Sequence, residues 1–87
     1  MVLTNNGGVI AAFINQSEKW TDSHNRNLRY SPWHGGELVN YKTVIAKWDG
    51  DTVLVDSRKY SRTTSKIQTQ LKNALMHAGI KTAQLDH

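Results

Sequence analysis

Hydrophobic and polar positions predict a β-hairpin in the middle of the chain. The segments E-L-V-N-Y-K-T-V-I-A-K-W (37–48) and D-T-V-L-V-D (51–56) are rich in β-branched and aromatic residues, and Asp49-Gly50 lies between them. An Asp-Gly pair is typical of a two-residue type I′ turn, in which both central residues need positive φ. Such a turn would pair Trp48 with Asp51. The same register places four apolar side chains on one core face: Val44, Ala46, Val53 and Val55.

The opposite face of this hairpin is mixed. Ile45 and Leu54 lie there among polar side chains, and Val39 and Tyr41 fall in phase with Ile45 rather than with Val44. This change of phase indicates a bulge or a twist in the first strand. Either an exposed edge of the hairpin or the apolar side with Ile45 and Leu54 would allow a homodimer.

The second clear pattern is an amphipathic helix over about 65–78. Ser65 and Gln68 match a capping box at its start. Gly79 supplies a left-handed residue after its end, and Ile80 a hydrophobic closing contact. The apolar stripe of this helix recurs at spacings of three and four and consists of Ile67, Leu71, Ala74, Leu75 and Ala78. We expect Ile67, Leu71 and Leu75 to pack on Val44, Val53 and Val55.

The N-terminal half is more ambiguous. The segment G-V-I-A-A-F-I-N-Q (8–16) is apolar almost throughout, so that a short helix capped by Asn5 or Asn6 and a strand both fit it. The segment N-L-R-Y (27–30) predicts a third strand, and S-P-W-H-G-G (31–36) a turn.

Together these elements predict one small α+β domain over 1–87. We expect a small antiparallel sheet centred on the 37–56 hairpin, with the 65–78 helix packed on it and a short helix near the N-terminus. The tail, 80–87, would add a short edge strand or fray. A chain of 87 residues can bury a modest core and is long enough for one domain.

Composition narrows the cellular context. The chain contains no cysteine, which excludes disulfides and thiolate metal sites. No apolar run approaches the roughly 20 residues that span a bilayer, and the start, M-V-L-T-N-N-G-G, lacks the basic region of a signal peptide. We therefore expect a soluble, cytoplasmic protein with no membrane partner.

Positive charge is concentrated in the C-terminal third. The net charge is +4, and no acidic residue occurs between Ser57 and Leu85. Six cationic residues lie in that interval: Arg58, Lys59, Arg62, Lys66, Lys72 and Lys81. Such a field attracts nucleic acid, anionic protein surfaces or phosphorylated ligands, and it also fits a solvated face that only keeps the protein dissolved.

The segment S-R-K-Y-S-R-T-T-S-K (57–66) places cations at the start of the predicted helix, where the helix dipole disfavours them. A bound anion would reverse that effect, because helix-end amides, hydroxyls and guanidinium groups together can hold a phosphate. Ordinary capping by Thr-Thr-Ser explains the same residues without a ligand. The candidate site for nucleic acid or another anion consists of Arg58, Lys59, Tyr60, Arg62, Thr64, Ser65, Lys66 and Lys72.

Aromatic and cationic residues are also adjacent elsewhere. The pairs Arg29-Tyr30, Trp33-His34, Tyr41-Lys42 and Lys47-Trp48 would suit stacking on a single strand. Three tryptophans in so short a chain are more often needed for the core than for stacking. As secondary contacts we single out Arg29, Trp33 and Lys47.

The motifs of common enzymes and nucleic-acid-binding folds are missing from the sequence. It has no P-loop, no G-x-G-x-x-G, no RNP signature and no zinc finger, and its four histidines are not at metal-ligand spacing. A nuclease would need a carboxylate cluster for magnesium or a histidine base. We expect a protein that is not an enzyme and has no cofactor or bound metal, with a nuclease as the less favoured alternative.

Two short motifs resemble a group of small uncharacterised proteins encoded by phages and prophages. Tyr41, Thr43, Ile45 and Ala46 match its strand motif Y-G-T-x-I-A, with Lys42 in place of the glycine. The segment K-Y-S-R-T-T-S-K-I-Q (59–68) matches its second motif, K-Y-S-x-T-T-S-x-x-Q. The resemblance implies a phage origin, action in the host cytoplasm and a small α+β domain, but no activity. With the charge, it leads us to expect a basic binding protein whose partner is nucleic acid or a host nucleoprotein. The alternative is an inhibitor of a host defence protein, similar to an anti-CRISPR protein.

Overall fold

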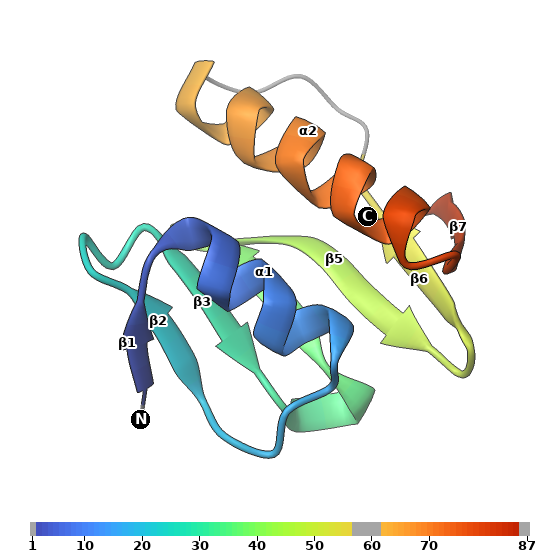
Figure 1. Ribbon diagram of the computed structural model, residues 1–87, viewed down its shortest axis with the longest axis horizontal. Coiled ribbons are helices and arrows are strands. Elements are labelled where there is room, and N and C mark those ends of the chain that lie inside the picture. The colour runs from blue at the N-terminus through green and yellow to red at the C-terminus, as the bar shows by residue number, and fades with distance from the viewer. Residues whose placement is uncertain (1, 57–61, 86–87) are drawn as a thin grey trace.

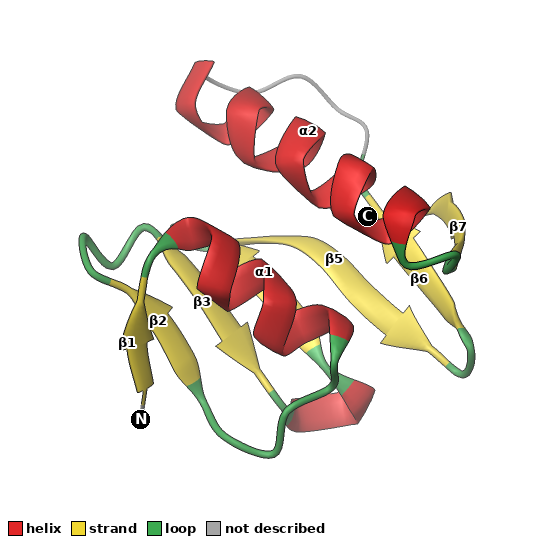
Figure 2. Ribbon diagram, in the orientation of Figure 1, coloured by secondary structure: helices red, strands yellow, loops and turns green. Residues whose placement is uncertain are grey.

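The computed structural model describes residues 2–56 and 62–85, which form one seven-stranded mixed sheet with two α-helices (Figures 1 and 2). In chain order the elements are β1 (Val2–Thr4), α1 (Asn6–Ile14), β2 (Thr21–Ser23), β3 (Leu28–Ser31), the 3-10 helix η1 (Trp33–Gly35), β4 (Glu37–Asn40), β5 (Thr43–Asp49), β6 (Thr52–Val55), α2 (Arg62–His77) and β7 (Lys81–Gln84). The predicted α+β class is confirmed, but the sheet is larger than predicted and is not purely antiparallel. Neither of the two α-helices in the described part of the chain has the length and apolarity to cross a bilayer.

Strand order in the sheet follows chain order from β1 to β7. The outer pairs, β1 with β2 and β6 with β7, are parallel and each is joined through a helix, whereas the four pairings between β2 and β6 are antiparallel. The four antiparallel pairings reverse the strand direction four times, so β6 runs parallel to β2. The crossover from β1 to β2 through α1 and the crossover from β6 to β7 through α2 therefore move across the sheet in the same direction. Because such crossovers are almost always right-handed, both helices are expected on one face. They do contact each other and share one core (Figure 1).

This core lies between the sheet and the two helices. The rings of Phe13 and Tyr30 meet edge to face with centroids 6.1 Å apart. Trp48 is partly buried beside them, and its Nε1 donates a 2.8 Å hydrogen bond to the carbonyl oxygen of Phe13. The buried apolar side chains of this core cluster are Val9, Ile10, Phe13, Leu28, Tyr30, Leu38, Ile45, Ala46, Val53, Val55, Ile67, Leu71 and Leu75.

The apolar N-terminal segment is a helix, which decides between the two alternatives that the sequence left open. Asn5 is the N-cap, since its Oδ1 accepts a 2.7 Å hydrogen bond from the backbone amide of Gly8. A Cβ atom at Gly8 would collide with the side chain of Thr4. Glycine at this position therefore allows α1 to start directly beside the end of β1.

The predicted strand over 37–48 is in fact two antiparallel strands. Tyr41 and Lys42 form the turn between β4 and β5, and Tyr41 has a positive φ of 56°. A shift of register beside Leu38 leaves Ile45 as an extra residue opposite β4, so that Ile45 and Ala46 are both buried. The bulge exists as predicted, but it places Ile45 in the core in place of Val44.

The turn between β5 and β6 lies one residue later than predicted. Asp49 pairs with Thr52, and Gly50 and Asp51 form the turn. Gly50 has the positive φ that the first turn residue requires. Trp48 consequently pairs with Val53 instead of with Asp51. Relative to the predicted register, each residue of β5 pairs with a residue of β6 two positions further on. Side chains alternate between the faces with a period of two, so Ala46, Val53 and Val55 stay on the core face.

The hairpin is not at an edge of the sheet. β5 pairs with β4 and β6 pairs with β7, so that neither of its outer sides is free. The edges are β1 and β7, and β7 confirms that the tail adds an edge strand. Ile45 is fully buried. Neither surface that the sequence suggested for a homodimer is therefore present as predicted.

Helix α2 begins at Arg62, three residues before the predicted start. Ser65 lies inside the helix, where its carbonyl oxygen accepts from Thr69 Oγ1, and Gln68 Nε2 donates 2.9 Å to the carbonyl oxygen of Asp56. The predicted capping box is therefore wrong. The predicted helix end is confirmed, because the amide of Ile80 donates to Leu75 and that of Gly79 to Met76, the two bonds of a Schellman motif.

Candidate nucleic-acid interface

One side of α2 packs on the sheet and the other side is exposed. Ile67, Leu71 and Leu75 are buried in the shared core and Ala74 is partly buried, in agreement with the predicted stripe, whereas Ala78 is exposed because α2 ends at His77. The opposite side carries polar and cationic residues and no acid. We call this side the outer face of α2; its exposed residues are Arg62, Lys66, Thr69, Asn73, Met76 and His77.

The cations of α2 point in two directions. Arg62 and Lys66 are one turn apart and share the outer face, whereas Lys72 lies about 120° around the helix axis from Lys66 at 3.6 residues per turn. Lys66 lines a shallow groove with Ser65, Thr69, Gln70 and Asn73. Lys72 lines a separate groove, which is more apolar, with Val55, Met76, Ile80 and Thr82.

Within the described residues, the cations of α2 form no salt bridge with a carboxylate. Within residues 2–56 and 62–85, the one salt bridge joins Arg29 to Asp22, with Nε and Oδ1 3.0 Å apart. Arg62, Lys66 and Lys72 are all exposed and have no carboxylate of that part of the chain at salt-bridge distance. These three cations of the predicted site therefore carry their charge at the surface.

Thr64 belongs to the interior and not to the predicted anion site. It is buried, and its Oγ1 donates a 2.6 Å hydrogen bond to Asn40 Oδ1. Asn40 Nδ2 in turn donates 2.6 Å to the carbonyl oxygen of Asn27. This chain of bonds fixes the first turn of α2 on β4 and positions the cations that follow. Three further candidates, Arg58, Lys59 and Tyr60, lie outside the described residues.

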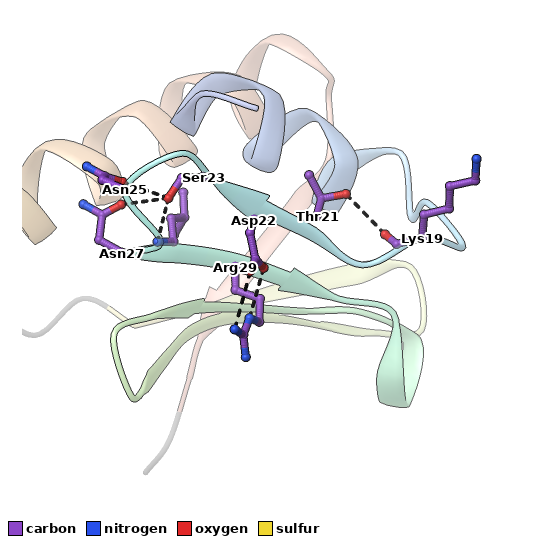
Figure 3. A network of polar contacts seen from close by, with 8 residues as sticks. Lys19, Thr21, Asp22, Ser23, Asn25, Asn27 and Arg29 are labelled. Carbon is purple, nitrogen blue, oxygen red and sulfur yellow. Dashed lines mark hydrogen bonds and ion pairs between the residues drawn. The ribbon is translucent and has the colours of Figure 1, made fainter. Parts of the chain in front are cut away.

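A second polar network orders the turn between β2 and β3. Ser23 Oγ lies 3.0 Å from both Asn25 Oδ1 and Asn27 Oδ1 and accepts from the amide of Leu28 (Figure 3). The turn lies beside the start of α1 and Gln70 of α2. Together they line a polar groove of about 530 Å³ formed by Asn5, Asn6, Gly7, Ser23, His24, Asn25 and Gln70. The polar composition of 23–27 indicates only a loop, so the sequence pattern gives no sign of this groove.

The secondary contacts that the sequence suggested lie elsewhere. Arg29 lies between the core residues Leu28 and Tyr30, and Lys47 between Ala46 and Trp48, so both project from the sheet face opposite the helices. Figure 3 shows the Arg29 side chain on that side, paired with the buried Asp22. Trp33, in η1, is 60% exposed.

The aromatic residues of the described chain divide between the core and the surface, where Trp20 is also 41% exposed. Tyr30 and Trp48 belong to the core, whereas Trp33 and Tyr41 are exposed at opposite ends of β4. Burial raises the pKa of Tyr30 above its usual value. Its hydroxyl donates a 2.6 Å hydrogen bond to the carbonyl oxygen of Ser17, so the phenol holds the loop after α1 in place.

Metal-binding clusters of three or more histidine and carboxylate side chains do not occur in the part of the chain that the structure describes. Its buried side-chain polar atoms all have hydrogen-bond partners. Comparison of the chain with models of known families, with curated proteins and with solved structures found no match. The chemistry of its own surface is therefore the basis for inferring its function.

Proposed function

We propose that this protein binds nucleic acid through the outer face of α2 without catalysing a reaction on it. The observation that carries the proposal is the pair Arg62 and Lys66, exposed one turn apart on a helix without acidic residues. Each lysine or arginine that neutralises a phosphate releases condensed counterions, and this release drives most non-specific binding.

The proposal also draws on other candidate residues. Lys72 adds a third exposed cation to α2, and Ser65 is partly exposed beside Lys66. Arg58 and Lys59 add two positive charges shortly before α2 in the sequence. Thr64 has no part in the proposal because its hydroxyl is buried against Asn40.

The proposal is tested by fluorescence anisotropy with a labelled 20-base-pair duplex of mixed sequence at 50 to 200 mM salt. We expect affinity to fall steeply with salt, and the double variant Arg62→Glu/Lys66→Glu to bind at least about 10-fold more weakly at the lowest salt. The control is Lys19→Glu/Lys47→Glu, which reverses one charge in the loop after α1 and one on the sheet face opposite the helices. Unchanged binding by the α2 variant, with its fold verified by circular dichroism, would contradict the proposal.

A protein partner is the second candidate, in the form of a host defence protein that this chain would inhibit. Met76 is 75% exposed beside the apolar groove of Val55 and Ile80, and exposed methionines are common at protein-binding surfaces. A complex of that kind would be recovered from host lysate treated with nuclease and would be lost in Met76→Glu. The protein would then shift no nucleic acid at 50 mM salt.

A further inference from the structure

We infer that the nucleic acid is duplex DNA and that α2 lies in its major groove. This inference rests on the nucleic-acid-binding role proposed above and assigns the bound form and the binding geometry. It is carried by the shape of α2, by the directions of its lysines and by the side chains between them.

Helix α2 has the dimensions that the major groove accepts. Its 16 residues give a length of about 24 Å, and a helix with side chains is about 10–12 Å wide. The major groove of B-DNA is about 12 Å wide and admits one α-helix. In Figure 1, α2 runs along the margin of the molecule.

The divergence of Lys66 and Lys72 fits a duplex better than a single phosphate. At 100° per residue the two lysines lie about 60° to either side of Thr69, in the middle of the outer face. A helix in a major groove has one phosphate backbone along each flank, so one lysine can reach each strand. A site for one phosphate would instead need its cations to converge.

The residues between the two lysines are of the types that contact base edges. Asn73 and Arg62 are exposed on the outer face and lie within about 40° of Thr69 around the axis. Asparagine forms paired hydrogen bonds with N6 and N7 of adenine, and arginine with O6 and N7 of guanine. These positions are therefore the ones that would contact bases while the lysines hold the backbones.

The rival nucleic acids fit α2 less well. Single strands are held chiefly by stacking on aromatic side chains, and 62–77 contains no aromatic ring of Phe, Tyr or Trp. Among the described residues, the exposed tryptophans and tyrosine, Trp20, Trp33 and Tyr41, all lie outside α2. Duplex RNA has a deep, narrow major groove that side chains cannot read. B-form DNA is the remaining form that matches this helix.

The first experiment compares a 20-base-pair DNA duplex with the RNA duplex and the single strand of the same sequence, by anisotropy over a salt series. We expect the DNA duplex to bind about 10-fold or more tightly than either. Lys66→Ala and Lys72→Ala should each lower the slope of log affinity against log salt by about 0.9, as expected for one lost phosphate contact. Lys19→Ala is the matched control and should leave the slope unchanged.

The second experiment locates the helix in the groove. A duplex in which 7-deazaadenine replaces adenine lacks the N7 acceptor of the major groove and keeps its minor groove. We expect wild-type protein to lose affinity for it by about 5- to 150-fold, the range for one paired base contact. Asn73→Ala should already have lost that affinity for normal DNA and should not distinguish the two duplexes. Asn15→Ala, an exposed asparagine outside α2, is the control and should behave as wild type.

The outcomes separate the two levels of the proposal. Equal binding of duplex RNA or of single strands, or no effect of 7-deazaadenine, overturns the major-groove inference while salt-dependent binding still supports a nucleic-acid role. An effect of Lys66→Ala without one of Lys72→Ala overturns the inference in favour of a single-phosphate site. Absence of binding to all three nucleic acids at 50 mM salt overturns the proposed function itself.

Discussion

Thr64 Oγ1 donates a 2.6 Å hydrogen bond to Asn40 Oδ1 and thereby ties the first turn of α2 to β4. Both side chains are buried, and they come from segments 24 residues apart. The bond lies within two residues of Arg62 and Lys66, so it fixes the part of the helix that carries the proposed interface. The sequence suggests this hydroxyl for ligand binding, whereas in the structure it holds α2 against the sheet.

Replacement of Thr64 by valine should destabilise the protein while conserving its shape. The change leaves Asn40 Oδ1 buried without this donor, which costs about 1–3 kcal/mol. The free energy of unfolding is measured by urea denaturation. Thr69→Val, at an exposed position of the same helix, is the control and should stay within about 0.5 kcal/mol of wild type. Equal effects of the two substitutions would show that the buried bond contributes nothing specific.

Leu71→Asp should unfold the domain. Leu71 is fully buried at the centre of the α2 stripe, and an aspartate there would place an unpaired charge in the core. The milder Leu71→Ala should remain folded and lose about 2–5 kcal/mol. Circular dichroism and urea denaturation measure both variants, with Asn73→Asp on the exposed side as control. A cooperatively folded Leu71→Asp protein would mean that α2 does not pack through this face.

Stability should decline at alkaline pH because of Tyr30. Burial raises the pKa of this phenol above its usual value near 10, so at high pH the unfolded chain loses the proton before the folded chain does. The stabilising effect is complete below about pH 10 and is lost as pH rises through the folded-state pKa. Tyr30→Phe should therefore be less stable than wild type at pH 7, since it lacks the bond to Ser17, but should lose less stability between pH 9 and pH 11.

The control for this pH effect is Tyr41→Phe. The ring of Tyr41 is 65% exposed, in the turn between β4 and β5. This variant should show the same alkaline loss as wild type in urea denaturation at each pH. Parallel curves for wild type and Tyr30→Phe between pH 9 and pH 11 would contradict the assignment to Tyr30.

Local patterns in the sequence were sufficient to predict α2 and its inner face. The stripe of Ile67, Leu71 and Leu75 follows from helical spacing alone, and Gly79 with Ile80 marks the end of the helix. The start was wrong by three residues, because a run of threonines and serine offers several equivalent N-caps. The burial of Thr64 depends on Asn40, which is distant in sequence, and no local pattern indicates it.

The turn at Tyr41 shows why the sheet was predicted only in part. Tyrosine favours strands and rarely adopts positive φ, so the segment 37–48 resembles one continuous strand. The amide of Tyr41 instead donates 3.0 Å to the carbonyl oxygen of Asn27, and this contact between distant segments stabilises the turn. The parallel pairings of β1 with β2 and of β6 with β7 are hidden from local patterns for a similar reason, since in each case a helix separates the two paired strands in the sequence.

The buried stripe of α2 and its exposed cations lie on opposite sides of one helix. Because the strands lie in the sheet in chain order, each strand after β1 can pair with a strand that has already been synthesised. The apolar face of β5 and β6 is covered only after residues 62–77 have been synthesised. Ile67, Leu71 and Leu75 complete that layer late in synthesis. Truncation upstream of α2 would therefore remove the proposed interface and leave Val53 and Val55 exposed to water, so a shortened chain would aggregate instead of persisting as a folded, inactive form.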